Sequence, residues 1–268
     1  MATSMAKEDL RFERVTGTIG AVAHGVELGA TPPPATIEAL RDAVHEFGVL
    51  FLEFDHVLDD ADFRAIADLF GQPEDGYALR PRDVESPVID SAMTPMEDYR
   101  INVWHTDGST LECPPQTAIL TALEVPEYGG DTMWASMYAA WDALSSHYQH
   151  LLDGLEALHS TKKLPFLDNG PTATHPVVLR DPVTQRQMLY VNANYTESIV
   201  GMHEHESDSL LEMLYEHVNT PEFHVRLRWR PGRVAVWDER ATQHRGVADF
   251  TGTRKLRRLT YPGTPPTA

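Results

Sequence analysis

The chain has 268 residues, of which 42% are apolar, so it can bury a substantial core, and its composition excludes collagen, a coiled coil and global disorder. Its formal charge is −18, from 22 basic and 40 acidic residues, and such a surface repels nucleic acids and anionic membranes. A single cysteine, Cys113, excludes an intrachain disulfide and fits a reducing compartment. The sequence carries no N-terminal signal pattern and no run of about 18 apolar residues. We therefore expect a cytoplasmic protein without nucleic-acid or membrane partners.

Short strands and helices alternate along the chain. Residues 11–28 predict short strands separated by glycine turns. A helix is expected over 35–46, a buried strand over 47–54 and a second helix over 59–70, which has an Asp-rich start suited to an N-cap. The order expected beyond these is strands at 87–91, 101–106, 116–124 and 130–134, a helix at 136–153, strands at 154–160, 175–180 and 187–193, a helix at 206–218, and strands at 223–229, 233–238, 243–248 and 255–261.

This order, many short strands with a few helices, favours a mainly-β α+β fold. Its core is expected to be a double-stranded β-helix, or jelly roll, braced by helices. No internal repeat and no linker divides the sequence. We therefore expect a single domain over residues 1–268, with flexible tails at 1–10 and 264–268.

The stretch Trp104-His105-Thr106-Asp107 carries a candidate metal pair. In a strand, residues i and i+2 point to the same face, so His105 and Asp107 would project together. With a third ligand from another strand they would form a facial triad, which leaves coordination positions open as non-haem iron(II) oxygenases require. In a chain with 13 histidines such a pair also arises by chance, so its weight depends on the residues downstream.

The segment Arg254-Lys255-Leu256-Arg257-Arg258 is basic in an acidic chain. In a strand, Arg254 and Arg258 would share one face and Lys255 would lie on the other. A buried arginine needs an anion, and its guanidinium matches a carboxylate as a two-pronged donor. The segment therefore indicates a dicarboxylate cosubstrate or an acidic substrate, with a solvated basic edge strand as the alternative.

A series of motifs extends along nearly the whole chain, from about residue 12 to residue 263. Their order and spacing resemble those of the taurine/2,4-dichlorophenoxyacetate dioxygenase family, TauD/TfdA. The motifs are Ile19-Gly20-Ala21 with Gly25-Val26, Gly48-Val49-Leu50-Phe51, Leu69-Phe70-Gly71, Trp104-His105-Thr106-Asp107, Gly129-Gly130-Asp131-Thr132-Met133-Trp134, His175-Pro176-Val177-Val178, Leu189-Tyr190-Val191-Asn192, and Val236-Trp237-Asp238 through His244-Arg245 to Arg254 and Arg258.

The resemblance implies an enzyme that uses iron(II), 2-oxoglutarate and O2. His105, Asp107 and His244 match the family's iron ligands. Thr132 and Arg254 match the residues that bind the far carboxylate of 2-oxoglutarate. The protein's part in such chemistry is to place the reacting groups and to exclude water.

Two assignments that follow from the resemblance are less direct. The interval from His244 to Arg254 is one residue shorter than in the taurine enzyme, so Lys255 is an alternative to Arg254 as the cosubstrate residue. The resemblance also implies four residues that contact the substrate. Arg258 matches the arginine that binds the substrate's anionic group in taurine-type members, and the other three are Asn102, Tyr77 and Arg80.

The reaction that the resemblance implies is oxidation of a substrate C–H bond, coupled to conversion of 2-oxoglutarate into succinate and CO2. Because Asp107 is a carboxylate and not Gly or Ala, the site lacks the vacancy that halogenases of this type use for chloride. We expect hydroxylation or desaturation of an unactivated C–H bond in a small anionic organic substrate. We also expect a homo-oligomer, either a dimer or a tetramer.

The segment between His159 and His175 is shorter than the lid that the family usually has there. A short lid predicts a site that is more open, or one that a partner subunit or a carrier closes, and a substrate larger than taurine. Lys162 and Lys163 lie in this segment and are candidates to meet an anionic substrate.

Three other functions compete with this prediction. A family member with the same iron centre can perform a biosynthetic oxidative rearrangement of an amino-acid-like metabolite. A non-catalytic jelly-roll binding protein would be signalled by loss of an iron ligand, and all three are present. A zinc hydrolase usually has more His or Cys ligands or a general-base Glu beside the metal, and it would give the Arg254–Thr132 pair no role.

Overall fold

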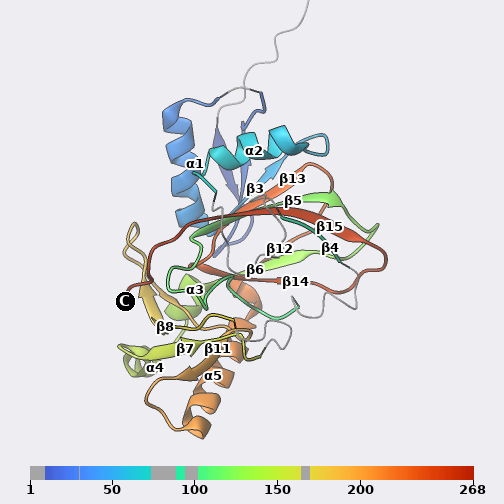
Figure 1. Cartoon of the computed structure of the whole chain (residues 1–268). Helices are drawn as coiled ribbons and strands as arrows, with labels where there is room; N and C mark the ends of the chain where they lie inside the picture. The colour runs from blue at the N-terminus through green and yellow to red at the C-terminus, as the bar shows by residue number, and fades with distance from the viewer. Residues whose placement is uncertain (1–9, 30, 74–88, 94–101, 164–169) are drawn as a thin grey trace, which may run out of the picture.

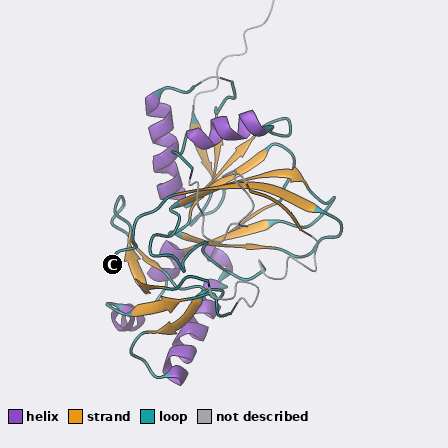
Figure 2. Cartoon of the chain, in the orientation of Figure 1, coloured by secondary structure: helices purple, strands orange, loops and turns teal. Residues whose placement is uncertain are grey.

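The computed structural model of the chain describes residues 10–29, 31–73, 89–93, 102–163 and 170–268, and it contains more strand than helix. Figures 1 and 2 show the arrangement of these elements. The helices are α1 (Pro34–Phe47), α2 (Asp60–Asp68), α3 (Met137–Asp142), α4 (Ser146–Leu152), α5 (Glu204–Val218) and the short 3-10 helix η3 (Pro221–Phe223). The strands are β1 (Arg11–Arg14), β2 (Ala21–His24), β3 (Val49–Glu53), β4 (Ile89–Met93), β5 (Thr117–Glu124), β6 (Thr132–Ser136), β7 (Glu156–His159), β8 (Ala173–Pro176), β9 (Val178–Arg180), β10 (Gln187–Leu189), β11 (Thr196–Ile199), β12 (His224–Leu227), β13 (Arg233–Asp238), β14 (Thr242–Gly246) and β15 (Arg254–Tyr261).

The largest sheet has seven strands in the order β1-β2-β3-β13-β5-β15-β4. A second sheet, β12-β6-β14, packs against one face of it (Figure 1). Between them lies an apolar core in which the Trp134 ring contacts those of Phe51 and Trp237, each at a centroid distance of 5.6 Å. The central strands β3, β5 and β13 are buried along most of their length, because the second sheet covers one face of the large sheet and helices cover the other.

The opposite face of the large sheet is covered by α1 and α2 (Figure 2). The Asp59 carboxylate accepts hydrogen bonds from the first backbone N–H groups of α2, as the sequence predicts for an N-cap. Phe63, Ile66 and Ala67 of this helix are buried against the sheet. Helix α1 ends at Phe47 and is capped by Gly48, whose φ of 73° suits glycine, and the chain then enters β3 directly.

A third layer is built from α3, α5 and the β9-β10 pair, which share a separate apolar core. The expected helix over 136–153 is two helices, α3 and α4, because the Ser145 side chain caps a new helix start. The strand expected over 175–180 is likewise divided at Val177 into β8 and β9. These are local breaks that apolar periodicity does not report.

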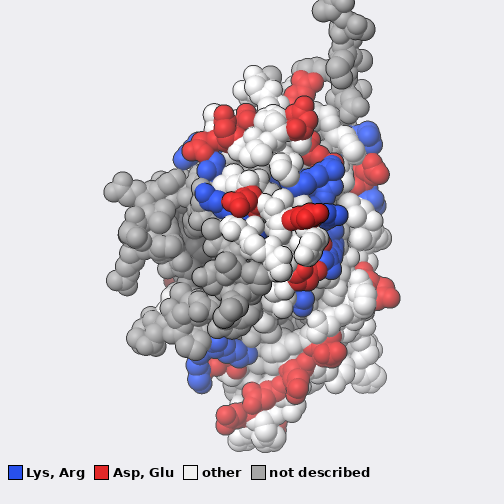
Figure 3. Space-filling model, turned by 90° about the vertical axis from the view of Figure 1, so that its right-hand side faces the viewer, with Lys and Arg blue, Asp and Glu red and all other residues white. Residues whose placement is uncertain are grey.

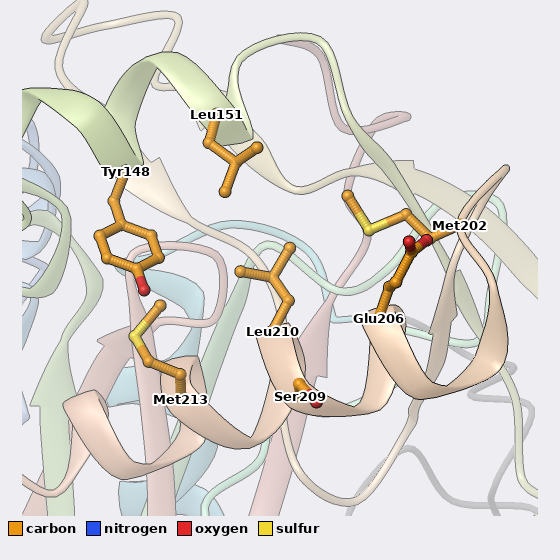
Figure 4. Close-up of a pocket in the computed structure, with 7 residues that line it drawn as sticks. All are labelled: Tyr148, Leu151, Met202, Glu206, Ser209, Leu210 and Met213. Atoms are coloured by element: carbon orange, nitrogen blue, oxygen red, sulfur yellow. The ribbon is translucent and has the colours of Figure 1, made fainter.

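A shallow apolar groove lies between α4 and α5 (Figure 4). Tyr148 and Leu151 of α4 point toward Leu210 and Met213 of α5, and Leu151 remains 48% exposed. Elsewhere on the surface, acidic side chains are spread over the face drawn in Figure 3, with basic side chains among them. In the described part of the chain, no helix combines the length and the apolar character needed to cross a bilayer.

The C-terminal residues 264–268, which we expected to be flexible, make three hydrogen bonds to the rest of the chain, one of them from the Arg240 guanidinium to the Thr264 hydroxyl oxygen at 3.2 Å. The backbone oxygen of Thr264 accepts from the Arg240 guanidinium, and that of Thr267 accepts from Arg180 N at 3.0 Å. Residues 1–9 of the other tail lie outside the described residues.

Candidate metal and cosubstrate site

One backbone bridge brings the predicted metal-binding side chains together. His105 N donates to His244 O at 3.1 Å, and His244 N donates to His105 O at 2.8 Å. The prediction of a strand over 101–106 is wrong for residues 102–106. Of these, only His105 pairs with another strand, through a single β-bridge, and residues 107–110 form a turn. Asp107 therefore meets the histidines from a turn, and the two-residue period of a strand is not what orients it.

His105, Asp107 and His244 each offer one ligand atom, and these atoms lie within 4.8 Å of one another. The Asp107 carboxylate faces both imidazole rings: its Oδ1 is 3.8 Å from His105 Nε2, and its Oδ2 is 3.4 Å from His244 Nε2. The three residues are 5%, 5% and 8% exposed, respectively. Both rings thus present Nε2 to a buried carboxylate.

Hydrogen bonds hold two of these groups in place. His105 Nδ1 lies 2.7 Å from the Val103 carbonyl oxygen, which only accepts, so Nδ1 carries the proton and Nε2 keeps its lone pair. The backbone N–H of Asp107 donates to Glu239 Oε2 at 3.1 Å. Next to it, the Thr106 hydroxyl donates to the Thr242 carbonyl at 3.1 Å and so fixes the turn to the start of β14.

The protonation states suit metal binding. Burial lowers the pKa of His105, and burial with the neighbouring His105 ring lowers the pKa of His244 well below its usual range. Burial alone would raise the pKa of Asp107, but Arg258 and the two imidazoles outweigh it and hold that pKa below its usual range. Neutral imidazole and ionised carboxylate are the forms that coordinate a metal. Two imidazoles and one carboxylate, buried and convergent, fit an iron(II) ion with open coordination positions.

Glu239 is a part of this site that the sequence analysis missed. It is fully buried, and its Oε2 lies 3.8 Å from His244 Nδ1 in addition to accepting the Asp107 N–H. Burial, and then the charge of Asp107, raises the pKa of Glu239 well above its usual range. The signal available in the sequence was an acidic residue directly after the Val236-Trp237-Asp238 motif.

Thr132 and Arg254 meet at the start of β6 and β15. Arg254 Nη2 donates to Thr132 Oγ1 at 2.9 Å, and Arg254 Nε donates to the Gly130 carbonyl at 2.7 Å. Trp229 Nε1 also donates to Thr132 Oγ1, at 2.9 Å. Because the Thr132 oxygen accepts twice, its own hydrogen is directed to a further acceptor. Thr132, Trp229 and Arg254 are 2%, 4% and 3% exposed, and such a buried cation with an available O–H group suits a carboxylate.

Trp229 was not predicted from the sequence. It follows β12, and only the pairing of β12 with β6 brings it beside Thr132. Gly130 has a φ of 68°, and a Cβ there would lie 3.2 Å from the Arg254 side chain. The glycine therefore permits the close approach of the arginine.

The arginines of β15 divide between its two faces. Arg258 forms an ion pair with Asp107 and lies 3.9 Å from Glu239, on the side of Arg254 and the smaller sheet. Arg257 pairs with Asp60 of α2, on the opposite side. Lys255, the sequence alternative to Arg254, is half-buried at the neighbouring position, and its backbone pairs with that of Glu124.

The other candidate substrate residues have mixed outcomes. Asn102 is half-buried, and within the described residues its Oδ1 is a buried atom without a hydrogen-bond partner. Tyr77 and Arg80 lie outside the described residues. Of the two lysines after β7, Lys162 Nζ pairs with Glu197 at 2.7 Å, and Lys163 Nζ donates to the Thr196 carbonyl at 2.8 Å. Both ammonium groups thus have acceptors within the chain.

Comparisons with known proteins agree with this geometry. The family described as "Taurine catabolism dioxygenase TauD, TfdA family" matches residues 11–260. An "Alpha-ketoglutarate-dependent sulfate ester dioxygenase" of Pseudomonas putida is 32% identical over 99% of this chain and 94% of its own length. An "Alkylsulfatase" of Acinetobacter baylyi is 30% identical over 96% of this chain and 86% of its own length.

Solved structures show the same likeness in three dimensions. A taurine dioxygenase from Burkholderia xenovorans superposes with a TM-score of 0.82 at 32% identity, covering 96% of this chain and 92% of that one. Because the family match, the full-length relatives and the fold all agree, the chain belongs to the TauD/TfdA family of dioxygenases, which depend on iron(II), 2-oxoglutarate and O2.

Proposed function

We propose that the chain oxidises an unactivated C–H bond of a small organic sulfate ester or sulfonate, with iron(II) held by His105, Asp107 and His244. The observation that carries this proposal is the convergence of these three buried side chains. The substrate class is taken from the relative that is described as a sulfate ester dioxygenase. Bound iron(II), 2-oxoglutarate and O2 supply the oxidant for the C–H bond, with succinate and CO2 as coproducts.

We assign the far carboxylate of 2-oxoglutarate to Arg254 and Thr132. Both side chains are buried and hydrogen-bonded to each other, and Thr132 has a hydrogen to donate. Lys255 is the less suitable group, because it is half-buried and lies at the neighbouring position of the strand. The polar contacts around Arg254 favour one orientation of its guanidinium before the cosubstrate arrives.

We assign the anionic group of the substrate to Arg258, with Asn102 as a second contact. Arg258 is the arginine beside Asp107, so a group bound to it would hold the substrate close to the metal ligands. Asn102 precedes His105 by three residues, and its buried side-chain oxygen would accept a hydrogen bond from a donor group of the substrate, outside the anionic group. Tyr77 and Arg80 stay predictions as substrate contacts.

A sulfate ester would be cleaved by this oxidation. Hydroxylation of the carbon that carries the sulfate oxygen gives a hydroxy sulfate. Its C–O bond to sulfate then breaks as the hydroxyl proton is lost, and the products are an aldehyde and inorganic sulfate. The carboxylate of Asp107 occupies the position that halide would need, so oxygenation or desaturation is favoured over halogenation.

The finer points of architecture belong to the same proposal. We infer that the large sheet and the β12-β6-β14 sheet form the two halves of a double-stranded β-helix, and that residues 1–268 act as one domain. A cytoplasmic location and a dimer or tetramer stay predictions. The short segment after β7 supports a substrate larger than taurine.

The decisive experiment is anaerobic addition of iron(II) and 2-oxoglutarate to metal-free enzyme. A weak visible charge-transfer band is expected, and it should be absent in His105→Ala. Oxygen is then admitted with a series of alkyl sulfates and with taurine, and succinate and inorganic sulfate are measured. A wild-type enzyme that gives neither the band nor succinate would refute the iron site. Equal efficiency with taurine and with longer sulfates would refute the prediction of a larger substrate.

A further inference from the structure

A second group of metal-binding side chains lies away from the iron ligands. It consists of His45 near the end of α1, Asp181 in the turn between β9 and β10, and Asp238 at the end of β13. One ligand atom from each lies within 4.8 Å of the other two. His45 Nδ1 is 3.2 Å from Asp238 Oδ2 and 3.9 Å from Asp181 Oδ2. We call these three residues the His45 cluster.

The two carboxylates are held so that one oxygen of each faces the imidazole. Asp181 Oδ1 accepts two backbone N–H groups of its own turn, each at 2.7 Å. Asp238 Oδ1 accepts two backbone N–H groups of the following turn, at 2.8 and 3.0 Å. Both side chains are only 3% exposed. The Oδ2 atoms of both carboxylates are thereby directed toward His45. The Tyr138 hydroxyl also donates a hydrogen bond of 2.6 Å to Asp181 Oδ2.

A buried pair of carboxylates requires a positive partner, because ionised groups out of water are costly unless their charge is balanced. His45 Nδ1 is a buried atom that, within the described residues, makes no hydrogen bond. The interaction with Asp238 Oδ2, 3.2 Å away, raises the pKa of His45, but the two groups lack the alignment of a strong N–H···O bond. One imidazolium would balance a single carboxylate, whereas a divalent cation with a neutral imidazole balances both.

We propose that the His45 cluster binds a divalent cation of the zinc class. Imidazole nitrogen and carboxylate oxygen are both zinc ligands, and bonds of about 2.1 Å in a tetrahedral site set neighbouring ligand atoms about 3.4 Å apart. The observed distances of 3.2 and 3.9 Å lie on either side of that value. Water would complete the coordination, since His45 retains 18% side-chain exposure.

The bound cation would join three parts of the fold that are distant in sequence. It would tie α1 to the β9-β10 turn and to the turn after β13, from which β14 carries His244 to the iron site. The Asp238 backbone contributes to the same junction, because its N–H donates to the Gly48 carbonyl and its carbonyl accepts from the Thr242 hydroxyl. The role of the bound cation is therefore structural, and the cation would support the segment that leads to His244 without contacting the iron site.

The test counts bound zinc in a chain that lacks the iron site. Untagged His105→Ala/His244→Ala protein is stripped of metal and dialysed against Zn²⁺. One equivalent is expected to remain bound, and Co²⁺ in its place should give the visible spectrum of a four-coordinate N/O site. Adding Asp238→Asn should abolish the zinc and the Co²⁺ spectrum. Asparagine keeps Oδ1 for the turn and replaces only the oxygen that faces His45.

Asp181→Asn serves as a second variant, and circular dichroism establishes that each variant folds. The matched control is His56→Ala: His56 also contacts two carboxylates, but Asp55 and Asp62 face opposite ring nitrogens, so the three cannot share one ion. The control should keep its equivalent of zinc. If the parent protein binds no zinc, a protonated His45 alone holds the cluster and the proposal is wrong. It is also wrong if zinc persists in both folded asparagine variants. Either result leaves the iron assignment untouched.

Discussion

Replacement of Arg254 tests which basic residue of β15 binds 2-oxoglutarate. In Arg254→Met the aliphatic volume is retained, but the guanidinium that donates to Thr132 and Gly130 is lost. A buried charge-assisted contact to a carboxylate contributes about 3 kcal/mol, and its loss corresponds to a dissociation constant about 100-fold higher. Lys255→Met removes one positive charge from the adjacent, half-buried position and should change the affinity by no more than about twofold.

The measurement is anaerobic titration calorimetry of 2-oxoglutarate with each variant loaded with Mn²⁺, a metal that does not start the reaction. Thermal unfolding is recorded in parallel, because Arg254 also ties β15 to the residues before β6. Weak binding is informative only in a variant that melts cooperatively. The reverse pattern, with affinity lost in Lys255→Met and retained in Arg254→Met, would refute the assignment.

Three further predictions concern 2-oxoglutarate binding and the stability of the fold. Trp229→Phe removes a neutral hydrogen bond to Thr132, worth about 1 kcal/mol, and should weaken 2-oxoglutarate binding about fivefold in the same titration. Burial, and then His175, lowers the pKa of His159 from 6.5 to about 3. As pH falls, the unfolded chain therefore protonates His159 before the folded chain does. The contribution of neutral His159 to stability is complete above its unfolded pKa of 6.5 and is lost as pH falls toward its folded pKa of about 3. Between pH 6.5 and 5, the free energy of unfolding in urea should therefore fall by about 2 kcal/mol more in the wild type than in His159→Gln. Equal decreases in the two proteins would contradict this. Gly232→Ala should destabilise the chain by at least about 2 kcal/mol more than Gly252→Ala, since both have positive φ but only a Cβ at 232 meets backbone oxygens, at 2.2 and 2.6 Å; similar melting temperatures would show that the contact relaxes.

Local patterns in the sequence were enough for most of the elements. The apolar spacing over 35–46 and 59–70 predicted α1 and α2, and the Asp-rich start at 59 is an N-cap. The runs over 233–238 and 255–261 correspond to β13 and β15. Such patterns depend on contacts between residues a few positions apart, so they can be read without knowing the fold. They did not reveal the break between α3 and α4, because a side-chain cap such as that of Ser145 interrupts a helix without changing its apolar spacing.

The candidate site was only partly accessible in this way. The residue types at 105, 107 and 244 could be selected from motif and spacing, but the reason first given for His105 and Asp107, a shared strand face, does not hold for a turn. Glu239 and Trp229 have no motif of their own. Each reaches the site through strand pairing, of β13 with its neighbours and of β12 with β6.

By itself, the sequence determined the chemistry available to this protein: two imidazoles and a carboxylate, a threonine, and arginines four residues apart on one strand. Only the tertiary structure decided which of them meet. The bridge between His105 and His244 closes the candidate metal site, and the register of β15 against β5 turns Arg254 and Arg258 toward it and Arg257 toward α2. The His45 cluster has the same origin, because its three residues are far apart in the chain. Local periodicity carries no information about strand order or register, and contacts between distant segments depend on both.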